Sequence, residues 1–473
     1  MLQNYREPNV YSKVTRRQPR VPETIVDLYP LVIGTGFEDY ASEILIEEVE
    51  LNAGATTFEL SDVTPDDKVV SVVVKNGTVV IEGSTFKKES DSWKVTLLSA
   101  VSATETTYLT VEVGIEGKGK FELQRFTGRK EDIEDFYGPV YDDNNEKNKK
   151  INNISLGASI ALESGSPVVY VLQVASAADN KTLAENYKKA LDECAVDVAG
   201  NPFWRIQPVD AGEEIQDVVA KFVKEMSSSE ERAEKYYGID TKTTGATTAK
   251  EVEDAFKAAI EKYTSNPNNY DAYRMQTFYP NEAEYTFTTP NGDVDEFIGG
   301  EFIAIAIAGA EQALERASQS LTNSVIPAGI FKSLKGVSMR RKEKNAIAAY
   351  GVTLLTQETE NGAITIRDSL SMDVSTEQVS DPCVTRGLDY GSKYVRGQLH
   401  PYIGKYNINE ELIAKAQASA TTAFATLVQK KIWKSANITD IFQNENDLNN
   451  LIIAARVGVL YPLKTIDVNI FCD

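Results

Sequence analysis

The sequence predicts a multidomain protein of combined α+β and α/β class, in which an α/β body carries an inserted β-rich domain and extended terminal arms. Three observations predict this architecture. The 473 residues exceed what one hydrophobic core usually serves, so several domains are expected. Short alternating strands fill residues 40–128, and strand-like and helix-like segments then alternate over residues 130–345.

Residues 1–28 are predicted to form an extended N-terminal arm. The segment holds five basic residues against three acidic ones, and Arg16, Arg17 and Arg20 are among the basic ones. Prolines at positions 8, 19 and 22 exclude a continuous helix. The composition fits either a disordered tail or an arm that orders on a neighbouring subunit.

Residues 29–129 are predicted to form the inserted β-rich domain. Runs of β-branched residues at 68–74 and 78–82 flank Asn76-Gly77, and Asn-Gly between such runs is a strong hairpin signal. Further alternating segments predict an antiparallel sandwich or small barrel.

Residues 130–345 are predicted to form an α/β domain. Pro167–Val174 is a short apolar strand of the kind buried on both faces. Apolar residues from Ile215 to Met226 recur at helical spacing. Ser227 with Glu230 then has the spacing of a capping box that starts another helix. Ile298–Ser318 is predicted to be an alanine-rich helix.

Residues 346–473 are predicted to form a C-terminal domain. Strands are expected near Gly351–Gln357 and Ala363–Arg367, followed by helices over Gly387–Leu399 and Glu410–Lys431. In the closing segment one face of a strand is formed by Ile466, Val468 and Ile470. Periodicity leaves open whether this strand pairs within its own subunit or with another.

Composition excludes several classes of function. The chain has 70 acidic and 49 basic residues, a net charge of −21, which argues against a broad nucleic-acid surface and against docking on anionic lipid. Three separated cysteines suggest neither a disulfide framework nor a thiolate zinc site. The N-terminus has no apolar signal segment, so a cytosol-like compartment is expected.

Tests for catalytic motifs are negative, so no catalytic, cofactor-binding or metal residues are predicted, and the chain is expected not to be an enzyme. The single histidine, His400, excludes any site that needs two imidazoles. Gly114–Phe121 nearly matches a phosphate loop, but Phe121 replaces the required hydroxyl and strands flank the motif, so a hairpin turn is preferred. Asp142–Glu146 lacks the glycine and distal glutamate of a calcium loop.

A basic cluster stands out against the acidic background. Lys430, Lys431 and Lys434 surround Trp433 at the end of an apolar helix. The helix dipole alone favours lysines there, and the functional alternative is a dock for an acidic protein surface.

The chain from about residue 28 to its end resembles contractile phage tail sheath proteins. No single segment is a chemical signature, and the resemblance depends on the order and spacing of several. These are Ile154–Leu172, Phe297–Ile330, Gly351–Leu355, Ile366–Asp373, Arg386–Arg396, Tyr402–Lys405 and Val457–Ile470.

The resemblance implies a structural subunit of the virion tail, assembled in the host cytoplasm. Subunits of such sheaths form a helical stack of rings, here expected to be hexameric, around a tail tube protein, with baseplate and tail terminator proteins as further partners. Contraction drives the tube through the host envelope. Neither nucleic acid nor membrane is an expected partner of this chain, and no cofactor is needed.

The resemblance also implies roles for segments and residues. The α/β part corresponds to the tail-sheath-like inner domain and the β-rich insertion to an outer domain. Both arms, with the last strand at about 457–473, are expected to pair with neighbouring subunits. The Lys430, Lys431 and Lys434 cluster is expected to face the tube. Polar positions of a family helix are matched by three residues expected to form salt bridges: Arg386, Asp389 and Arg396.

Two alternatives stay open. The sheath of a cell-encoded contractile injection system has the same fold, and genomic neighbours would distinguish it. A non-contractile surface or adhesion protein is supported only by the β-rich insertion.

Overall fold

The computed structural model describes residues 28–464 with short gaps. The gaps are residues 39, 41–42, 62, 65–66, 90–91, 103, 117–119, 143–149, 198–202, 229–230, 232, 244 and 404–406. The predicted arm residues Arg16, Arg17, Arg20, Ile466, Val468 and Ile470 therefore lie outside the described residues.

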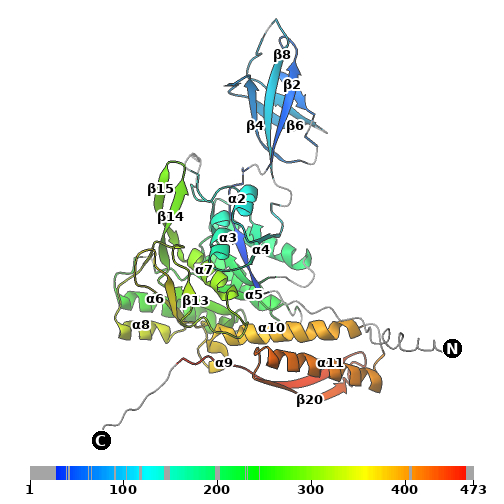
Figure 1. Cartoon of the computed structure of the whole chain (residues 1–473), viewed down its shortest axis with the longest axis vertical. Helices are drawn as coiled ribbons and strands as arrows, with labels where there is room; N and C mark the ends of the chain where they lie inside the picture. The colour runs from blue at the N-terminus through cyan, green and yellow to red at the C-terminus, as the bar shows by residue number, and fades with distance from the viewer. Residues whose placement is uncertain are drawn as a thin grey trace, which may run out of the picture.

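A nine-stranded sheet forms the centre of the body (Figure 1). In spatial order its strands are β16 (Val325–Ile326), β19 (Ile364–Asp368), β18 (Val352–Gln357), β13 (Met275–Tyr279), β12 (Tyr236–Gly238), β11 (Phe203–Pro208), β1 (Tyr29–Gly34), β10 (Val168–Gln173) and β9 (Gln124–Thr127). The strands from β18 to β10 run parallel, and β9, β16 and β19 are antiparallel additions at the edges. The chain order reverses at β1, as in doubly wound α/β folds.

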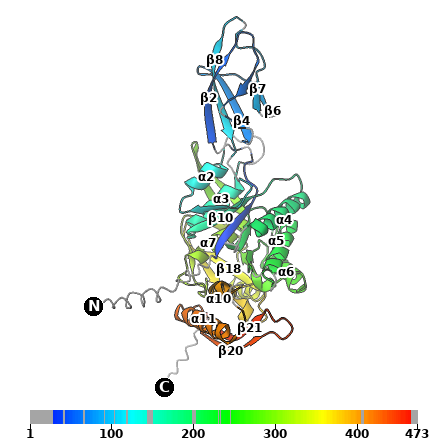
Figure 2. The same ribbon diagram turned by 90° about the vertical axis from the view of Figure 1, so that its right-hand side faces the viewer.

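Helices cover both faces of this sheet (Figure 2). One face packs against α4 (Asn180–Asp197), α5 (Glu213–Met226), α6 (Ala249–Thr264) and α8 (Arg341–Ala348). The other packs against α2 (Glu131–Tyr137), α3 (Asn153–Glu163) and α7 (Gly300–Gln312). Alternate residues of β1 divide between the two cores, with Leu31 and Ile33 in one and Val32 in the other. This double burial explains why the parallel strands are apolar along their whole length.

A smaller sheet extends from the body beside α7. It consists of β15 (Gly292–Gly299), β14 (Glu282–Thr289) and β17 (Ser333–Lys335), in that order. The one-turn helix η2 (Ala272–Arg274) leads into β13.

The inserted β-rich domain lies at one end of the molecule (Figure 1). One sheet has β2 (Glu43–Leu51), β8 (Thr107–Ile115), β4 (Val69–Asn76) and β5 (Val79–Val80), and the other β3 (Thr57–Leu60), β7 (Ser92–Thr96) and β6 (Thr85–Glu89). The predicted hairpin turn joins β4 to β5, and Gly77 adopts the positive φ of +62° that this turn requires. The domain has a hydrophobic core of its own, formed entirely within residues 45–115.

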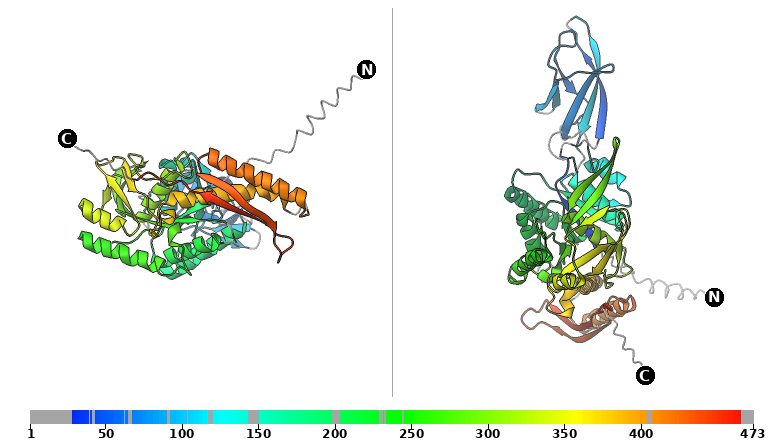
Figure 3. Two further views of the ribbon diagram at one scale, coloured as in Figure 1. Left: turned by 90° about the horizontal axis from the view of Figure 1, so that it is seen from below. Right: turned by 90° about the vertical axis from the view of Figure 1, so that its left-hand side faces the viewer.

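The C-terminal layer lies at the opposite end of the body (Figure 3). It contains α9 (Glu377–Ser380), α10 (Pro382–Leu399), η3 (His400–Tyr402), α11 (Glu410–Gln429), β20 (Ser435–Gln443) and β21 (Leu451–Gly458). Its core includes Trp433, whose indole packs so closely on α10 that a side chain at Gly391 would overlap it.

The sheets divide the chain differently from the predicted domains. β1 and β9 belong to the main sheet, so the β-rich unit spans about 43–115 rather than 29–129. β18 and β19 also belong to the main sheet, so the predicted boundary between residues 345 and 346 falls within one layered body. The predicted boundaries follow changes in local composition, whereas sheet membership is determined by hydrogen bonds between strands that are distant in sequence.

Two local predictions are wrong. No helix restarts in the described part of the segment after α5. Instead, the Lys235 amide donates to Ser227 Oγ, and the chain enters β12. Val457 and Gly458, placed in the donated strand, belong to β21, which pairs with β20 of the same chain.

Candidate assembly surfaces

Asp389 on α10 joins the C-terminal layer to the main sheet. It is 3% exposed and accepts a bidentate pair of hydrogen bonds from Arg274, at 2.7 and 3.0 Å. The Trp204 indole, on β11, donates to the same carboxylate at 2.8 Å. Burial opposes the charge of Arg274, but the Asp389 carboxylate outweighs burial and raises the pKa of the guanidinium above its ordinary value. Because β11 begins and η2 ends at the amino edge of the sheet, Asp389 fixes α10 across that edge.

Of the other two predicted salt-bridge residues, Arg396 contacts a carboxylate, whereas Arg386 contacts an amide oxygen. Arg396 forms a bidentate contact with Glu234, at 2.8 and 2.6 Å. Arg386 is 4% exposed and lies 3.5 Å from the Gln312 amide oxygen, while its Nε and Nη1 have no hydrogen-bond partner in the described structure. Burial lowers the pKa of Arg386. The sequence does not indicate the partners of Arg396 and Asp389, which are Glu234 and Arg274, because these lie on other elements and far away in sequence.

Lys430, Lys431 and Lys434 lie together, exposed, at the junction of α11 and β20. Lys430 is the C-cap of α11, and its ammonium lies 5.7 Å from the Tyr394 ring centroid. Lys431 has a φ of +56°, which turns the chain so that Ile432 and Trp433 are buried while the lysines stay outside. The turn thus exposes three positive charges within five residues of the chain.

The hairpin of β20 and β21 is a second candidate surface. These strands pair only with each other among the described residues. One face packs against α11 and the core beneath it, through Ala436, Ile438 and Val457. Both outer edges therefore present backbone N–H and C=O groups to which an extended chain can add.

Both ends of the described part of the chain, residues 28 and 464, join the body at this layer. Leu28 is buried in the core that contains Trp433, and its carbonyl accepts from the Gln312 side chain at 2.8 Å. At the other end, the Lys464 ammonium lies 2.8 Å from an Asp368 oxygen and 3.2 Å from an Asp381 oxygen. The segments that precede Leu28 and follow Lys464 are those predicted to act as arms.

The single histidine and the near match to a phosphate loop both lie in structural rather than catalytic surroundings. His400 begins η3 at the end of α10. Lys120, from the near match to a phosphate loop, is 1% exposed and donates to the carbonyls of Phe37, Glu38 and Tyr40. It thereby joins the two chain segments that connect the β-rich domain to the body.

The described residues contain no cluster of His, Cys, Asp and Glu suited to a metal ion. Among them there is also no helix long and apolar enough to cross a membrane. Two hollows of about 640 and 520 Å³ flank Gly336 and Val337 beside β17. They are lined by mixed polar and apolar side chains, including Tyr279 in both.

Comparisons with known proteins identify one curated relative and several solved structures of similar fold. No family model matches the chain. The tail sheath protein of Mycobacterium phage Bxz1 is 24% identical over 355 residues, which is 73% of this chain and 55% of that protein. The chain thus spans about half the length of this relative.

Two solved structures share the fold at low sequence identity. A chain of the anti-feeding prophage baseplate, 6-fold symmetrised, aligns with a TM-score of 0.53 and 14% identity, covering 75% of this chain and 89% of that one. A chain of the same baseplate in its contracted state aligns with a TM-score of 0.55 and 10% identity, covering 76% and 91%. The chain therefore shares its mixed α/β fold with these two baseplate chains. Together with the curated relative, this shared fold confirms the resemblance to contractile tail sheath proteins that the sequence predicts.

Proposed function

We propose that this chain is a structural subunit of a contractile phage tail sheath, which polymerises helically around a tail tube and contracts to drive it through the host envelope. The observation that carries this proposal is the similarity to a tail sheath protein across 73% of the chain. The inner domain would be the layered body with its C-terminal layer, and the β-rich domain would be the outer insertion. The second candidate function is that of a sheath subunit in a cell-encoded contractile injection system, which would assemble in the same way.

The C-terminal layer supports assembly by strand exchange. Packing against α11 supports the β20–β21 hairpin as a two-stranded sheet whose outer edges are unpaired among the described residues. Arms from neighbouring subunits, added to these edges of β20 and β21, would extend that sheet. Main-chain hydrogen bonds would provide affinity, and alternate side chains such as Ile466, Val468 and Ile470 would set the register.

Such contacts between copies produce a helical assembly without a fuel site. A head-to-tail interface that does not close generates a filament. Flexible connections would let subunits rotate as rigid bodies while the strands stay paired, so that one subunit supports an extended and a contracted lattice. Hexameric rings, the tail tube, the baseplate and the tail terminator are the partners that this proposal requires.

Electron microscopy of the purified chain tests the proposal. The full-length protein should form wide hollow tubes, and variants that lack residues 1–22 or 465–473 should remain monomers or short rings. A variant with Lys188→Met, which removes an exposed ion pair on α4, provides the control and should assemble normally. If the full-length chain forms no tubes alone or with its tube protein as template, the proposal is wrong.

A further inference from the structure

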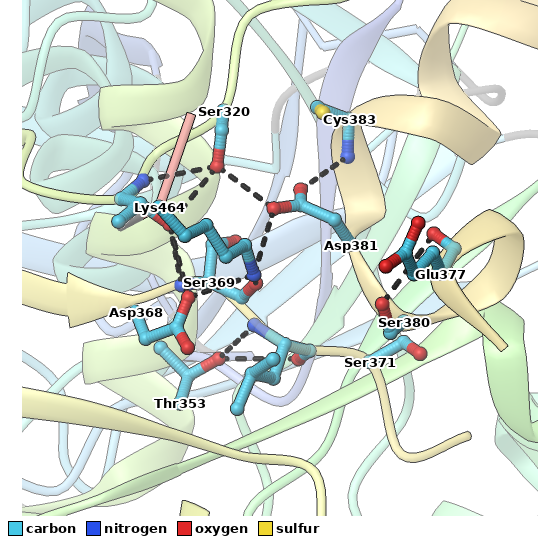
Figure 4. A network of polar contacts seen from close by, with 12 residues as sticks. Ser320, Thr353, Asp368, Ser369, Ser371, Glu377, Ser380, Asp381, Cys383 and Lys464 are labelled. Carbon is cyan, nitrogen blue, oxygen red and sulfur yellow. Dashed lines mark hydrogen bonds and ion pairs between the residues drawn. The ribbon is translucent and has the colours of Figure 1, made fainter. Parts of the chain in front are cut away.

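Lys464 connects three parts of the molecule at the point where the described chain ends (Figure 4). Its ammonium pairs with Asp368, the last residue of β19, and with Asp381, the N-cap of α10. It also lies 3.4 Å from the Ser369 carbonyl oxygen. A single side chain thus joins the edge of the main sheet, the start of α10 and the chain that comes from β21.

The position of Asp381 is fixed without any contribution from Lys464. One carboxylate oxygen caps α10 by accepting from the Cys383 amide at 3.0 Å. The other accepts from the Ser320 hydroxyl at 3.0 Å. Asp381 is 1% exposed, so its negative charge requires a nearby cation, and Lys464 provides it.

Lys464 also attaches its own segment to the body through polar contacts. Tyr461 and Leu463, between β21 and Lys464, are 47% and 77% exposed and pack little apolar surface. The Lys464 side chain, in contrast, is 29% exposed and points between the two carboxylates. Burial lowers its pKa, but the charges of Asp381 and Asp368 outweigh burial and raise the pKa above the ordinary value, so the side chain stays charged at neutral pH.

We infer that the contacts of Lys464 with Asp368 and Asp381, here called the Lys464 clip, fix where and in which direction the C-terminal arm leaves the subunit. The inference rests on the proposed function, because it assigns a positioning residue to strand donation. Donation in one register requires the arm to start from a fixed point. The clip also attaches the arm to both the sheet and α10, so that a pull on the arm acts on the whole body.

The direct test uses the unassembled subunit and a spin label close to the clip. Ile466→Cys in a Cys472→Ser background offers a labelling site, and Cys194 and Cys383 are buried. With Lys464 intact, the label should show a restricted component, and Lys464→Met should abolish it. Equal spectra for the two proteins would overturn the inference.

Two carboxylate variants test the same contacts and guard against misfolding of the lysine variant. Asp381→Asn removes the charge but keeps a favourable capping residue, and Asp368→Asn changes a side chain that is 32% exposed. Each should free the label, and Lys464→Met combined with Asp381→Asn should free it no further than either change alone. Lys415→Met, in an exposed pair with Glu411, should leave the spectrum unchanged.

Assembly gives the functional readout and separates the two proposals. If tubes form, Lys464→Met should reduce the tube yield at least about tenfold at equal protein concentration while the circular dichroism of the subunit is unchanged. Normal yield with a freed label would show that the arm needs no fixed exit and would overturn the inference. Absence of tubes from the unaltered chain, both alone and with its tube protein as template, would contradict the sheath proposal, and the label would still decide whether the clip exists.

Discussion

At the scale of single residues, Asp389 holds α10 to the sheet through hydrogen bonds from Arg274 and Trp204. Asp389→Asn would leave the Arg274 guanidinium, whose side chain is 8% exposed, without its buried counter-charge. Breaking such a pair typically costs about 3–5 kcal/mol. Urea unfolding monitored by tryptophan fluorescence should show a loss of that size, and Trp204 lies against the carboxylate as a reporter. Asp192→Asn, in an exposed pair on α4, should change the free energy of unfolding by less than about 0.5 kcal/mol.

A second residue-scale prediction concerns pH. Burial and the neighbouring Asp240 carboxylate raise the pKa of Glu301 to about 7, against the opposing charge of Lys242. The folded state therefore binds a proton that the unfolded state releases at lower pH, so this group stabilises the fold most under acidic conditions. Its contribution should fall as pH rises from about 4.5 to 7, by about 1.4 kcal/mol per unit of pKa shift.

Glu301→Gln, which cannot titrate, isolates this effect. Between pH 5 and 7 the unfolding free energy of the unaltered chain should decline relative to that of the variant. Parallel pH profiles would show that Glu301 titrates normally.

Resemblance to a known helix predicts salt-bridge roles for Arg386, Asp389 and Arg396, yet it could not supply partners, and Arg386 contacts an amide oxygen rather than a carboxylate. Arg274 lies 115 residues from Asp389, and Glu234 lies 162 residues from Arg396. Local spacing contains no information about such pairs. The fold alone brings the amino edge of the sheet against α10.

At the scale of elements, the turn between α11 and β20 is predicted to contact an acidic surface of the tail tube. Changing Lys430, Lys431 and Lys434 to glutamate reverses its charge, and because all three are exposed the subunit should still fold. Co-sedimentation with tube protein should decrease at least about tenfold at low salt and only slightly at high salt, where screening already weakens the contact. Lys188→Glu on α4 should have no effect, and an equal loss there would show a general charge effect.

Elements differ in how clearly the sequence indicates them. The sequence predicts β10 because this strand is buried on both faces, and it predicts α5 because this helix buries one face. Burial in each case imposes an apolar pattern on the sequence. The sequence does not indicate β20 and β21, because every residue of both strands is exposed or half-buried and no buried face imposes an apolar pattern. The strands that offer free edges to a partner are therefore those that periodicity indicates least.

At the scale of the whole molecule, the mixed fold class and the presence of a β-rich insertion follow from the sequence, but the domain limits do not. β1 pairs with β10 although more than one hundred residues separate them in the chain, and β18 lies beside β13 although a separate sheet intervenes in the chain. Composition changes at the insertion, whereas membership of the sheet depends on long-range hydrogen bonds. The position of β1 at the point where the strand order reverses could be known only from the structure.

The insertion itself should be removable. Its core lies wholly within residues 45–115, and the segments that connect it to the body meet at Lys120, whose ammonium lies 3.3 Å from the Tyr40 carbonyl oxygen. Replacing residues 43–115 with a short Gly-Ser linker should therefore leave the unfolding free energy of the body within about 1 kcal/mol, because the β-rich domain has its own core and shares none of its core residues with the body. Tubes should still form, and electron micrographs should show them thinner in outer diameter with an unchanged inner channel. A truncated chain that folds but no longer assembles would place subunit contacts in the β-rich domain, against its assignment as an outer insertion.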